Sequence, residues 1–333
     1  MKKQILAVCD SEAEYTRRFC NYVSKKTEYP FEVAAFTSRE KLQKFCEEED
    51  VDILLISESA YDLSLKKFIK GEIIVLRNEK GTEQKEQSVY RYQSCETILK
   101  EVMSSYSGKN PEGMDRERNG NLQMIGLFTP VHRCMQTTFA MTLGEILAKQ
   151  YKVLYLNFES FSGLEKRLNR EFMTDMSDLI YYISNAREAL FYKLKSITET
   201  IQRMDYIPPA FSYMDLNRVT LQQWILLFRE LEKLTSYDYL ILDLSDNIQG
   251  LFDILRMCKK VFTMVREDDM ARSKLYQYER LLERTDFQDV WKKTRQCRLP
   301  LIRNISFDMQ QLTYGDLADY VRKLIKEEFD GES

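Results

Sequence analysis

Glycine is scarce in this sequence, with 11 residues among 333, about 3% against the roughly 7% usual in globular proteins. Glycine-rich loops that wrap phosphate groups must therefore be few. Histidine is rarer still, because His132 is the only one. A single imidazole excludes every metal site that needs two, such as a zinc site of the HExxH type.

Paired cysteines and long apolar runs are also missing. The seven cysteines are odd in number and contain no C-x-x-C pair, which excludes a zinc ribbon and disfavours a disulfide framework. The apolar run Ile5–Cys9 ends at Asp10 and is too short for the core of a secretion signal. No stretch approaches the roughly 18 to 20 apolar residues that span a bilayer. We therefore expect reduced thiols and a cytoplasmic location.

The composition provides enough apolar residues for two folded cores. Hydrophobic residues make up 44% of the chain and charged residues 30%, which excludes global disorder. The length of 333 residues is about twice the roughly 150 typical of one domain. The net charge of −3 gives no overall attraction to nucleic acid or anionic lipid.

Strand and helix patterns alternate on both sides of a polar segment, Ser107–Gly120, which has the glycine, proline and charge of an interdomain linker. This alternation favours the α/β class, with two doubly wound parallel sheets. The sequence predicts domains over residues 1–106 and 121–329, a linker over 107–120 and a tail over 330–333. The expected strands are Gln4–Val8, Phe31–Phe36, Ile53–Ile56 and Ile73–Leu76, then Met124–Phe128, Val153–Asn157, Asp205–Ile207, Tyr239–Leu244 and Lys260–Val265. The expected helices are Glu12–Lys25, Arg39–Glu48 and Cys95–Tyr106, with a further helix capped by Thr220 and Gln223.

The second half has the order of a P-loop nucleotide-binding domain. The strand Met124–Phe128 leads into the loop Thr129–Thr138, and a helical pattern follows to Gln150. Further on, Asp243 stands at the end of a buried strand, as does the carboxylate that holds the water shell of Mg²⁺ in P-loop enzymes.

In this order of elements the sequence resembles the MinD/ParA-type P-loop ATPases, and among them the TadZ/CpaE-like pilus-assembly proteins, in which a receiver-like domain precedes the ATPase domain. The strings that support the resemblance are the loop, Val153–Gly163, Ser177–Ile183, Asp205–Pro209, the Asp243 strand and Gly315–Val321. The resemblance implies a flavodoxin-type first domain, a P-loop NTPase second domain, and ATP and Mg²⁺ as cofactors. It also implies a homodimer and protein partners in Flp-type (Tad) pilus or secretion machinery, with recruitment to a cell pole or to membrane machinery.

The loop departs from the family pattern, roughly P/K-x-G-G-x-G-K-T-T, at each glycine. The three glycines fall on His132, Arg133 and Met135. Glycine lets the backbone adopt left-handed conformations that cost other residues about 1–2 kcal/mol, and it lets a phosphate approach closely. We therefore expect three side chains in these places to distort or fill the phosphate cradle.

The lysines of the family pattern are missing as well. The catalytic lysine falls on Gln136, and Pro130 stands at the family-specific second lysine. Comparable cations contribute on the order of 10³ or more in rate, so we expect no catalytic residue and no ATP hydrolysis. Binding without turnover stays open. Its remnant nucleotide site would be Arg133, Gln136, Thr137 and Thr138, and its remnant magnesium ligands Thr137 and Asp243.

The receiver-like half lacks the phosphorylation residues of its family. Where the family has a pair of acidic residues, this sequence has only one, Asp10. Ser57 stands at the position of the phosphoacceptor aspartate. Arg77 falls near the Thr/Ser position, and Tyr92 and Gln93 fall where the lysine is expected. Serine does not form an acyl phosphate, so we expect no phosphoacceptor. Asp10 has a structural interpretation too, as a cap of the helix that follows it.

Two surface segments allow more than one interpretation. The run Lys292–Arg298 holds four basic residues, as in ParA-like proteins that bind DNA, but a solvated helix or loop is favoured by the acidic total. The stripe Leu317, Val321, Leu324 near the C-terminus resembles a membrane-binding helix, but its acidic end favours packing on its own domain.

The leading hypothesis is a cytoplasmic scaffold or localisation protein for Flp-type pilus or related secretion machinery, with ATP hydrolysis lost. The first alternative is a noncanonical ATP-binding switch that dimerises with nucleotide, in which Arg133 replaces the lysine. The second alternative is a DNA-binding, partition-like protein.

Overall fold

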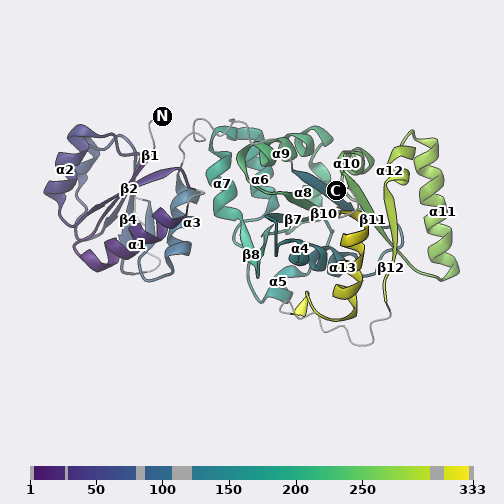
Figure 1. Ribbon diagram of the computed structural model, residues 1–333. Coiled ribbons are helices and arrows are strands. Elements are labelled where there is room, and N and C mark those ends of the chain that lie inside the picture. The colour runs from purple at the N-terminus through teal and green to yellow at the C-terminus, as the bar shows by residue number, and fades with distance from the viewer. Residues whose placement is uncertain (1–3, 27–28, 80–86, 107–121, 301–310, 330–333) are drawn as a thin grey trace. The chain divides into compact units, whose positions relative to one another are not determined.

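The computed structural model describes residues 4–26, 29–79, 87–106, 122–300 and 311–329 (Figure 1). These residues form two compact units. The first unit combines the described residues up to 106 with Ala186–Ser196, and the second contains the remainder. The predicted linker over 107–120 and the tail over 330–333 lie outside the described residues, and the predicted domain boundaries stay a prediction.

The first unit contains a five-stranded sheet in the order β2-β1-β3-β4-β5, with every neighbouring pair parallel. This is the flavodoxin-like order, which confirms the doubly wound class for this half. Its strands are β1 Gln4–Cys9, β2 Phe31–Phe36, β3 Ile53–Ser57, β4 Glu72–Arg77 and β5 Ser88–Tyr90. Its helices are α1 Ala13–Lys25, α2 Arg39–Glu48, the short 3₁₀ helix η1 Leu63–Lys67 and α3 Cys95–Ser105.

Part of the first unit comes from a distant stretch of the chain. Helix α7, Leu190–Ile197, contributes Tyr192, which is fully buried. Its ring stacks on Phe31 at 5.9 Å between centroids and meets Tyr106 edge-on at 4.7 Å. Its hydroxyl donates a hydrogen bond to the side chain of Gln4. Aromatic packing therefore fixes this segment to the first unit.

The second unit contains a seven-stranded sheet in the order β12-β11-β6-β10-β7-β9-β8. All neighbouring pairs are parallel except β8 and β9, which form an antiparallel hairpin at one edge. The expected parallel sheet is thus confirmed, with one antiparallel edge strand added. The strands are β6 Gln123–Leu127, β7 Val153–Asn157, β8 Glu199–Ile201, β9 Met204–Ile207, β10 Tyr239–Asp243, β11 Lys260–Val265 and β12 Thr294–Arg298.

Helices cover both faces of this sheet (Figure 1). Helices α4 and α13 pack together on one face, and α9 and α10 pack together on the other. Helix α9 begins with the capping box predicted at Thr220 and Gln223, and its Trp224 is fully buried. The helices are α4 Gln136–Leu147, α5 Leu164–Leu168, α6 Met176–Asn185, η2 Arg187–Ala189, α8 Tyr213–Arg218, α9 Leu221–Leu234, α10 Leu251–Met257, α11 Asp269–Arg284, α12 Gln288–Lys292 and α13 Gly315–Glu328.

The basic run Lys292–Arg298 is mostly an edge strand, so the expectation of a helix or loop is wrong, whereas Lys292, Arg295 and Arg298 are exposed to solvent as expected. Strand β12 pairs with β11, and Cys297 points into the core with no exposed area. The Lys293 ammonium donates to the carbonyl oxygens of Arg256 and Cys258, each at 2.6 Å. Arg295 forms ion pairs with Glu327 and Glu328 of α13. The strand forms because sheet pairing and these contacts compensate for its polar sequence.

The C-terminal stripe packs in its own unit, as the sequence predicted. Leu317, Val321 and Leu324 of α13 are buried in the core that also contains Phe139 of α4. No helix in the described part of the chain is both long and apolar enough to cross a bilayer.

Candidate functional site

The carboxyl ends of β6, β7 and β10 meet at one edge of the second sheet, where ligands bind in open parallel α/β folds. Asp243, the last residue of β10, lies level with Leu127 of β6 and with Asn157 of β7. The loop from Phe128 to Met135 joins β6 to α4 at the same edge. The topology therefore brings together the loop and the carboxylate that the sequence singled out.

The loop keeps a left-handed backbone at the three positions where the family pattern has glycine. The φ angles are 59° at His132, 49° at Arg133 and 66° at Met135. Each such conformation costs a residue with a side chain about 1–2 kcal/mol. Thr129 anchors the start of the loop, because its hydroxyl donates to the carbonyl oxygen of Met264 at 2.7 Å. The three residues thus take the left-handed conformation that glycine takes at lower cost, and whether they distort the cradle stays a prediction.

A cavity of about 260 Å³ lies beside the loop, so the three side chains do not fill this space completely. It is lined by Thr129, His132–Thr138, Glu159, Leu244 and Ser245. Thr137 and Thr138 are half-buried on its wall, whereas His132 and Arg133 are exposed. The cavity is slightly smaller than the roughly 300 to 1,000 Å³ typical of small-molecule pockets.

Gln136 occupies the lysine position and is committed to the protein interior. Its side-chain amide donates to Asp243 Oδ1 at 2.7 Å and to the carbonyl oxygen of Leu244 at 2.9 Å. Only 7% of Gln136 is exposed, so its amide group is turned inward and not toward a bound phosphate.

The other oxygen of Asp243 is also occupied. Oδ2 accepts a hydrogen bond from the Tyr155 hydroxyl at 2.8 Å and one from the Asn157 amide at 3.1 Å. Asp243 is fully buried, and burial raises the pKa of its carboxyl. Hydrogen bonds from Gln136, Thr137 and Tyr155 oppose that rise in pKa. We call Asp243, Gln136, Tyr155 and Asn157 the buried polar cluster.

These contacts decide whether the site fits the magnesium ion that a P-loop ATPase uses. The Thr137 side chain forms a hydrogen bond with Asp243, and their role as magnesium ligands stays a prediction. A hydrated Mg²⁺ needs a free carboxylate oxygen, and the buried polar cluster leaves neither oxygen of Asp243 free. The residues present therefore do not fit an Mg²⁺-dependent hydrolytic site. No group of three or more His, Cys, Asp or Glu side chains in the described residues is arranged to hold a metal.

Glu159 is the acid of the cavity wall. Burial raises its pKa to about 7, with smaller contributions from the charges of Asp243 and Asp246. A neutral or weakly ionised carboxyl repels an anion less than a full charge does. Anion binding at the loop should therefore weaken as Glu159 ionises.

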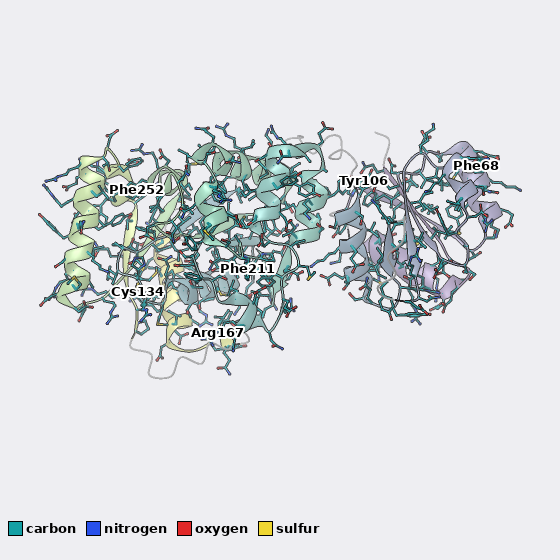
Figure 2. The ribbon with its side chains drawn as sticks, turned by 180° about the vertical axis from the view of Figure 1, so that it is seen from behind. Phe68, Tyr106, Cys134, Arg167, Phe211 and Phe252 are labelled. Atoms are coloured by element: carbon teal, nitrogen blue, oxygen red, sulfur yellow. The ribbon has the colours of Figure 1, made fainter. Side chains whose placement is uncertain are left out.

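Cys134, in the middle of the loop (Figure 2), is structural. Its side chain is buried, and its sulfur lies 3.8 Å from the Thr129 hydroxyl and 3.8 Å from the carbonyl oxygen of Met264. Burial raises the pKa of the thiol, which disfavours the nucleophilic thiolate.

At the edge of the first sheet, too, a buried acid is paired with a side chain of the protein itself. Asp10 is fully buried, and Arg91 forms ion pairs with Asp10, at 3.1 Å, and with Glu12. The Arg91 guanidinium also lies over the Tyr15 ring at 4.6 Å. Asp10 accepts a hydrogen bond from the Glu12 backbone at 2.9 Å just before α1. The N-cap of α1 is Glu12 itself and has no side-chain cap bond, so the interpretation of Asp10 as the cap of this helix is wrong. An internal cation thus neutralises the single acid that receiver chemistry would need for a metal.

The remaining receiver positions hold side chains that contact their neighbours within the unit. Ser57, at the phosphoacceptor position, is buried and contacts the Ser59 hydroxyl at 3.3 Å. Arg77 is buried and pairs with Glu58 at 3.2 Å. The sequence placed Tyr92 and Gln93 at the lysine position and did not single out the adjacent Arg91.

Sequence reasoning also missed two members of the buried polar cluster, Tyr155 and Asn157. The available signal was a polar residue, Asn157, at the end of a strand with five buried residues. A buried amide needs a hydrogen-bonding partner, and the neighbouring strand in a P-loop fold is the one that ends in Asp243.

Comparison with solved structures identifies the architecture of the second unit. A ParA family ATPase from Chlorobium tepidum matches with a TM-score of 0.50 and 13% identity, covering 61% of this chain and 97% of that protein. The second unit has the ParA/MinD fold. Weaker similarities are to a putative plasmid partition protein from Borrelia burgdorferi bound to AMPPNP (TM-score 0.45, 14% identity, 64% and 100% coverage) and to the MinC:MinD complex of Aquifex aeolicus (0.42, 14%, 61% and 96%).

No protein-family model and no curated protein matches the sequence. At 13% identity the similarity to the ParA family ATPase establishes the ParA/MinD fold and nothing about activity.

Proposed function

We propose that this protein is a catalytically silent member of the ParA/MinD fold that acts as a scaffold or localisation factor. The observation that carries the proposal is the buried polar cluster. Gln136 stands in place of the lysine and donates to Asp243, whose second oxygen is bonded to Tyr155 and Asn157. The groups that would bind and polarise a triphosphate are thereby used to stabilise the fold.

An exposed apolar group at the same sheet edge supports a protein-binding role. Phe161 follows β7 and Phe211 follows β9, and each is 86% exposed. The Phe161 ring lies 5.9 Å from that of Tyr213, and Met214 is 56% exposed. Large aromatic and methionine side chains are enriched at protein interfaces and costly to leave in water. We propose that this edge contacts a protein partner or a second copy of the chain.

The pilus or secretion context rests on the resemblance of the domain order to TadZ/CpaE-like proteins. The flavodoxin-like first sheet followed by a ParA/MinD second sheet is consistent with that order. Deletion of the gene in its host, scored for surface pili by electron microscopy, tests it. The proposal is supported if deletion abolishes pili, and if the wild-type gene restores them whereas a Phe161→Ser/Phe211→Ser variant does not. Unchanged piliation after deletion contradicts it.

The proposed absence of ATP hydrolysis is tested with the purified full chain. We expect phosphate release from ATP and Mg²⁺ to equal the buffer background, with the same result for an Asp243→Asn variant. Turnover by the wild type that disappears in the Asp243→Asn variant would contradict catalytic silence.

A second candidate function is ATP binding without hydrolysis, in a switch that dimerises. It is favoured by one observation, the left-handed loop with its remaining cavity beside Thr137 and Thr138. Backbone N–H groups at the start of α4 and the Arg133 side chain would then bind the phosphates. Calorimetry with ATP decides between the two. If the wild type releases or absorbs heat on binding ATP and an Arg133→Ala variant does not, the switch is favoured. A flat titration of the wild type at millimolar ATP excludes the switch.

A further inference from the structure

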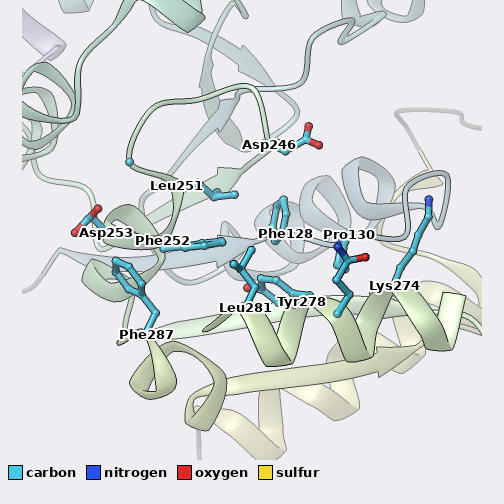
Figure 3. Close-up of a pocket in the computed structure, with 12 residues that line it drawn as sticks. Phe128, Pro130, Asp246, Leu251, Phe252, Asp253, Lys274, Tyr278, Leu281 and Phe287 are labelled. Carbon is cyan, nitrogen blue, oxygen red and sulfur yellow. The ribbon is translucent and has the colours of Figure 1, made fainter. Parts of the chain in front are cut away.

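Two grooves of the second unit have similar volumes but different charges. The groove in Figure 3, between α11 and the turn before α10, has a volume of about 570 Å³. Its lining is apolar and holds one lysine, Lys274, against the two carboxylates of Asp246 and Asp253, so it selects no charged ligand. The other groove, of about 520 Å³, lies between α13 and the end of α4, and most of its charged residues are cations.

The charges of this second groove favour an anion. Among the described residues that line it, four are cations and one is an acid. The cations are Lys149, which follows α4, and Arg322, Lys323 and Lys326 of α13. The acid, Asp319, forms an ion pair with Arg322. The lining therefore has three positive charges in excess, although the whole chain has a net charge of −3.

Three of these cations are available to a ligand. Lys149 and Lys326 are exposed, and no residue in the described part of the chain forms an ion pair with either ammonium group. The Lys323 side chain is 80% exposed and has a long contact, 3.9 Å, with Glu327. Lysine binds phosphate as a point charge and does not require one fixed geometry. A ligand with two negative charges therefore binds here without breaking a short internal contact.

Aromatic rings form the apolar part of the same groove. Tyr239 meets Tyr151 edge-on at 5.1 Å between ring centroids, and it meets Phe329 edge-on at 5.9 Å. Ile146 and Ile325 also line the groove. Apolar walls beside a few charged groups are typical of small-molecule sites. The lining therefore suits an anion that has an apolar body better than it suits inorganic phosphate.

The groove is separate from the loop cavity. Tyr239 is the first residue of β10 and Asp243 is the last, so the groove and the loop lie at opposite edges of the sheet. They also lie at opposite ends of α4, which has 12 residues and is therefore about 18 Å long. No residue of the buried polar cluster lines the groove.

We propose that this groove binds a soluble phosphate ester with an apolar body. The phosphate pairs with Lys149, Lys323 and Lys326, and the body packs against the aromatic rings. The acids Glu327 and Glu328 on the same helix disfavour a flat anionic membrane as the occupant. The inference goes beyond the proposed scaffold function, because it involves neither the loop nor the exposed apolar group at the other edge of the sheet.

The test is equilibrium dialysis of the full chain with naphthyl phosphate, followed by the fluorescence of the naphthyl group. We expect saturable binding at one site. Naphthalene sulfonate, a monoanion, should bind about threefold more weakly, and neutral naphthol about tenfold more weakly. The affinity for naphthyl phosphate should fall below about pH 6, where the phosphate takes up a proton. The affinity for the sulfonate should stay constant over the same range.

Variants locate the site. Lys149→Glu/Lys326→Glu should weaken the binding of naphthyl phosphate at least about tenfold, and Lys149→Arg/Lys326→Arg should retain it. Lys292 is exposed on α12 outside the groove, so Lys292→Glu is the matched control for a reversed charge. Arg133 lines the loop cavity, so Arg133→Ala should leave the affinity unchanged. Unfolding curves identify any variant that fails to fold.

Three results would overturn the proposal. The first is no saturable binding of naphthyl phosphate by the wild type. If such a protein sediments with vesicles of phosphatidylcholine and phosphatidic acid, the cations contact a membrane instead. The second is equal binding by the folded Lys149→Glu/Lys326→Glu variant. The third is loss of binding in Arg133→Ala, which would place the phosphate at the loop. None of the three bears on the proposed scaffold function.

Discussion

At the scale of single residues, the loop edge of the second sheet departs from the P-loop pattern at Gln136 and in the contacts of Asp243. Asp243 in the buried polar cluster accepts hydrogen bonds on both oxygens, so its contribution is to stability. Removal of one member of such a cluster leaves the others buried and unsatisfied, which costs more than the bonds themselves contribute.

Asp243→Ala should therefore lower the free energy of unfolding by about 3 to 5 kcal/mol, because four donors lose their acceptor: Gln136, Thr137, Tyr155 and Asn157. Asp246→Ala is the control. The Asp246 side chain is 61% exposed, so its loss should change stability by less than about 0.5 kcal/mol. Urea unfolding measures both. Equal, small effects of the two substitutions would show that the cluster does not stabilise the fold.

Two glutamates, the buried Glu145 and the half-buried Glu159, should make stability depend on pH. Burial raises the pKa of Glu145 and of Glu159 from 4.5 to about 7 in the folded protein. The folded state therefore binds protons more tightly than the unfolded state, and stability falls as pH rises from 4.5 to about 7, then levels off. Glu145→Gln and Glu159→Gln should each flatten this slope, measured as the urea midpoint across pH. A slope unchanged in the double variant would contradict the assignment.

At the scale of elements, a capping box starts helix α9. Thr220 accepts a hydrogen bond from the Gln223 backbone, and the Gln223 side chain accepts one from the Thr220 backbone. Thr220→Ala should lower the free energy of unfolding by about 1 kcal/mol. Ser38 begins α2 without a side-chain cap bond, so Ser38→Ala should have a smaller effect in the same denaturation experiment.

The edge strand β12 allows a test of the DNA-binding alternative. Lys293 and Arg295 already bond to carbonyl oxygens and to glutamates of α13. Replacing Lys292, Lys293 and Arg295 by glutamine should therefore leave retention on a DNA column at low salt unchanged. A marked loss of retention, with the fold intact by circular dichroism, would favour a partition-like protein instead.

The elements also show how much of the structure could be predicted from sequence. Strands with continuous apolar runs, such as β3 and β10, were predicted to within a residue or two because burial on both faces leaves a clear pattern. Strand β12 was missed because its sequence is polar. It belongs to the sheet only through its pairing with β11, which the local sequence does not reveal. The positions of Gln136 and Asp243 were predicted, but their contacts with Tyr155 and Asn157 depend on the register between strands, which no local pattern contains.

At the scale of the whole molecule, the first unit is assembled from two distant stretches of the chain. Tyr192 packs against Phe31 and Tyr106 inside that unit. Tyr192→Ala should lower the stability of the first unit by about 3 to 5 kcal/mol, because a large aromatic side chain is lost from a core. The control is Tyr181→Ala, since Tyr181 is 62% exposed. Near-UV circular dichroism during urea unfolding measures both variants, and an equal effect would contradict this packing.

The backbone of the loop at residues 132–135 has a consequence for recognising this fold from sequence. The loop takes three left-handed conformations without glycine, and both of its ends are bonded to neighbouring strands. The Thr129 hydroxyl donates to Met264 of β11, and the Gln136 amide donates to Asp243 of β10. A search that requires a glycine signature misses a loop of this kind, whereas a superposition of backbones detects it.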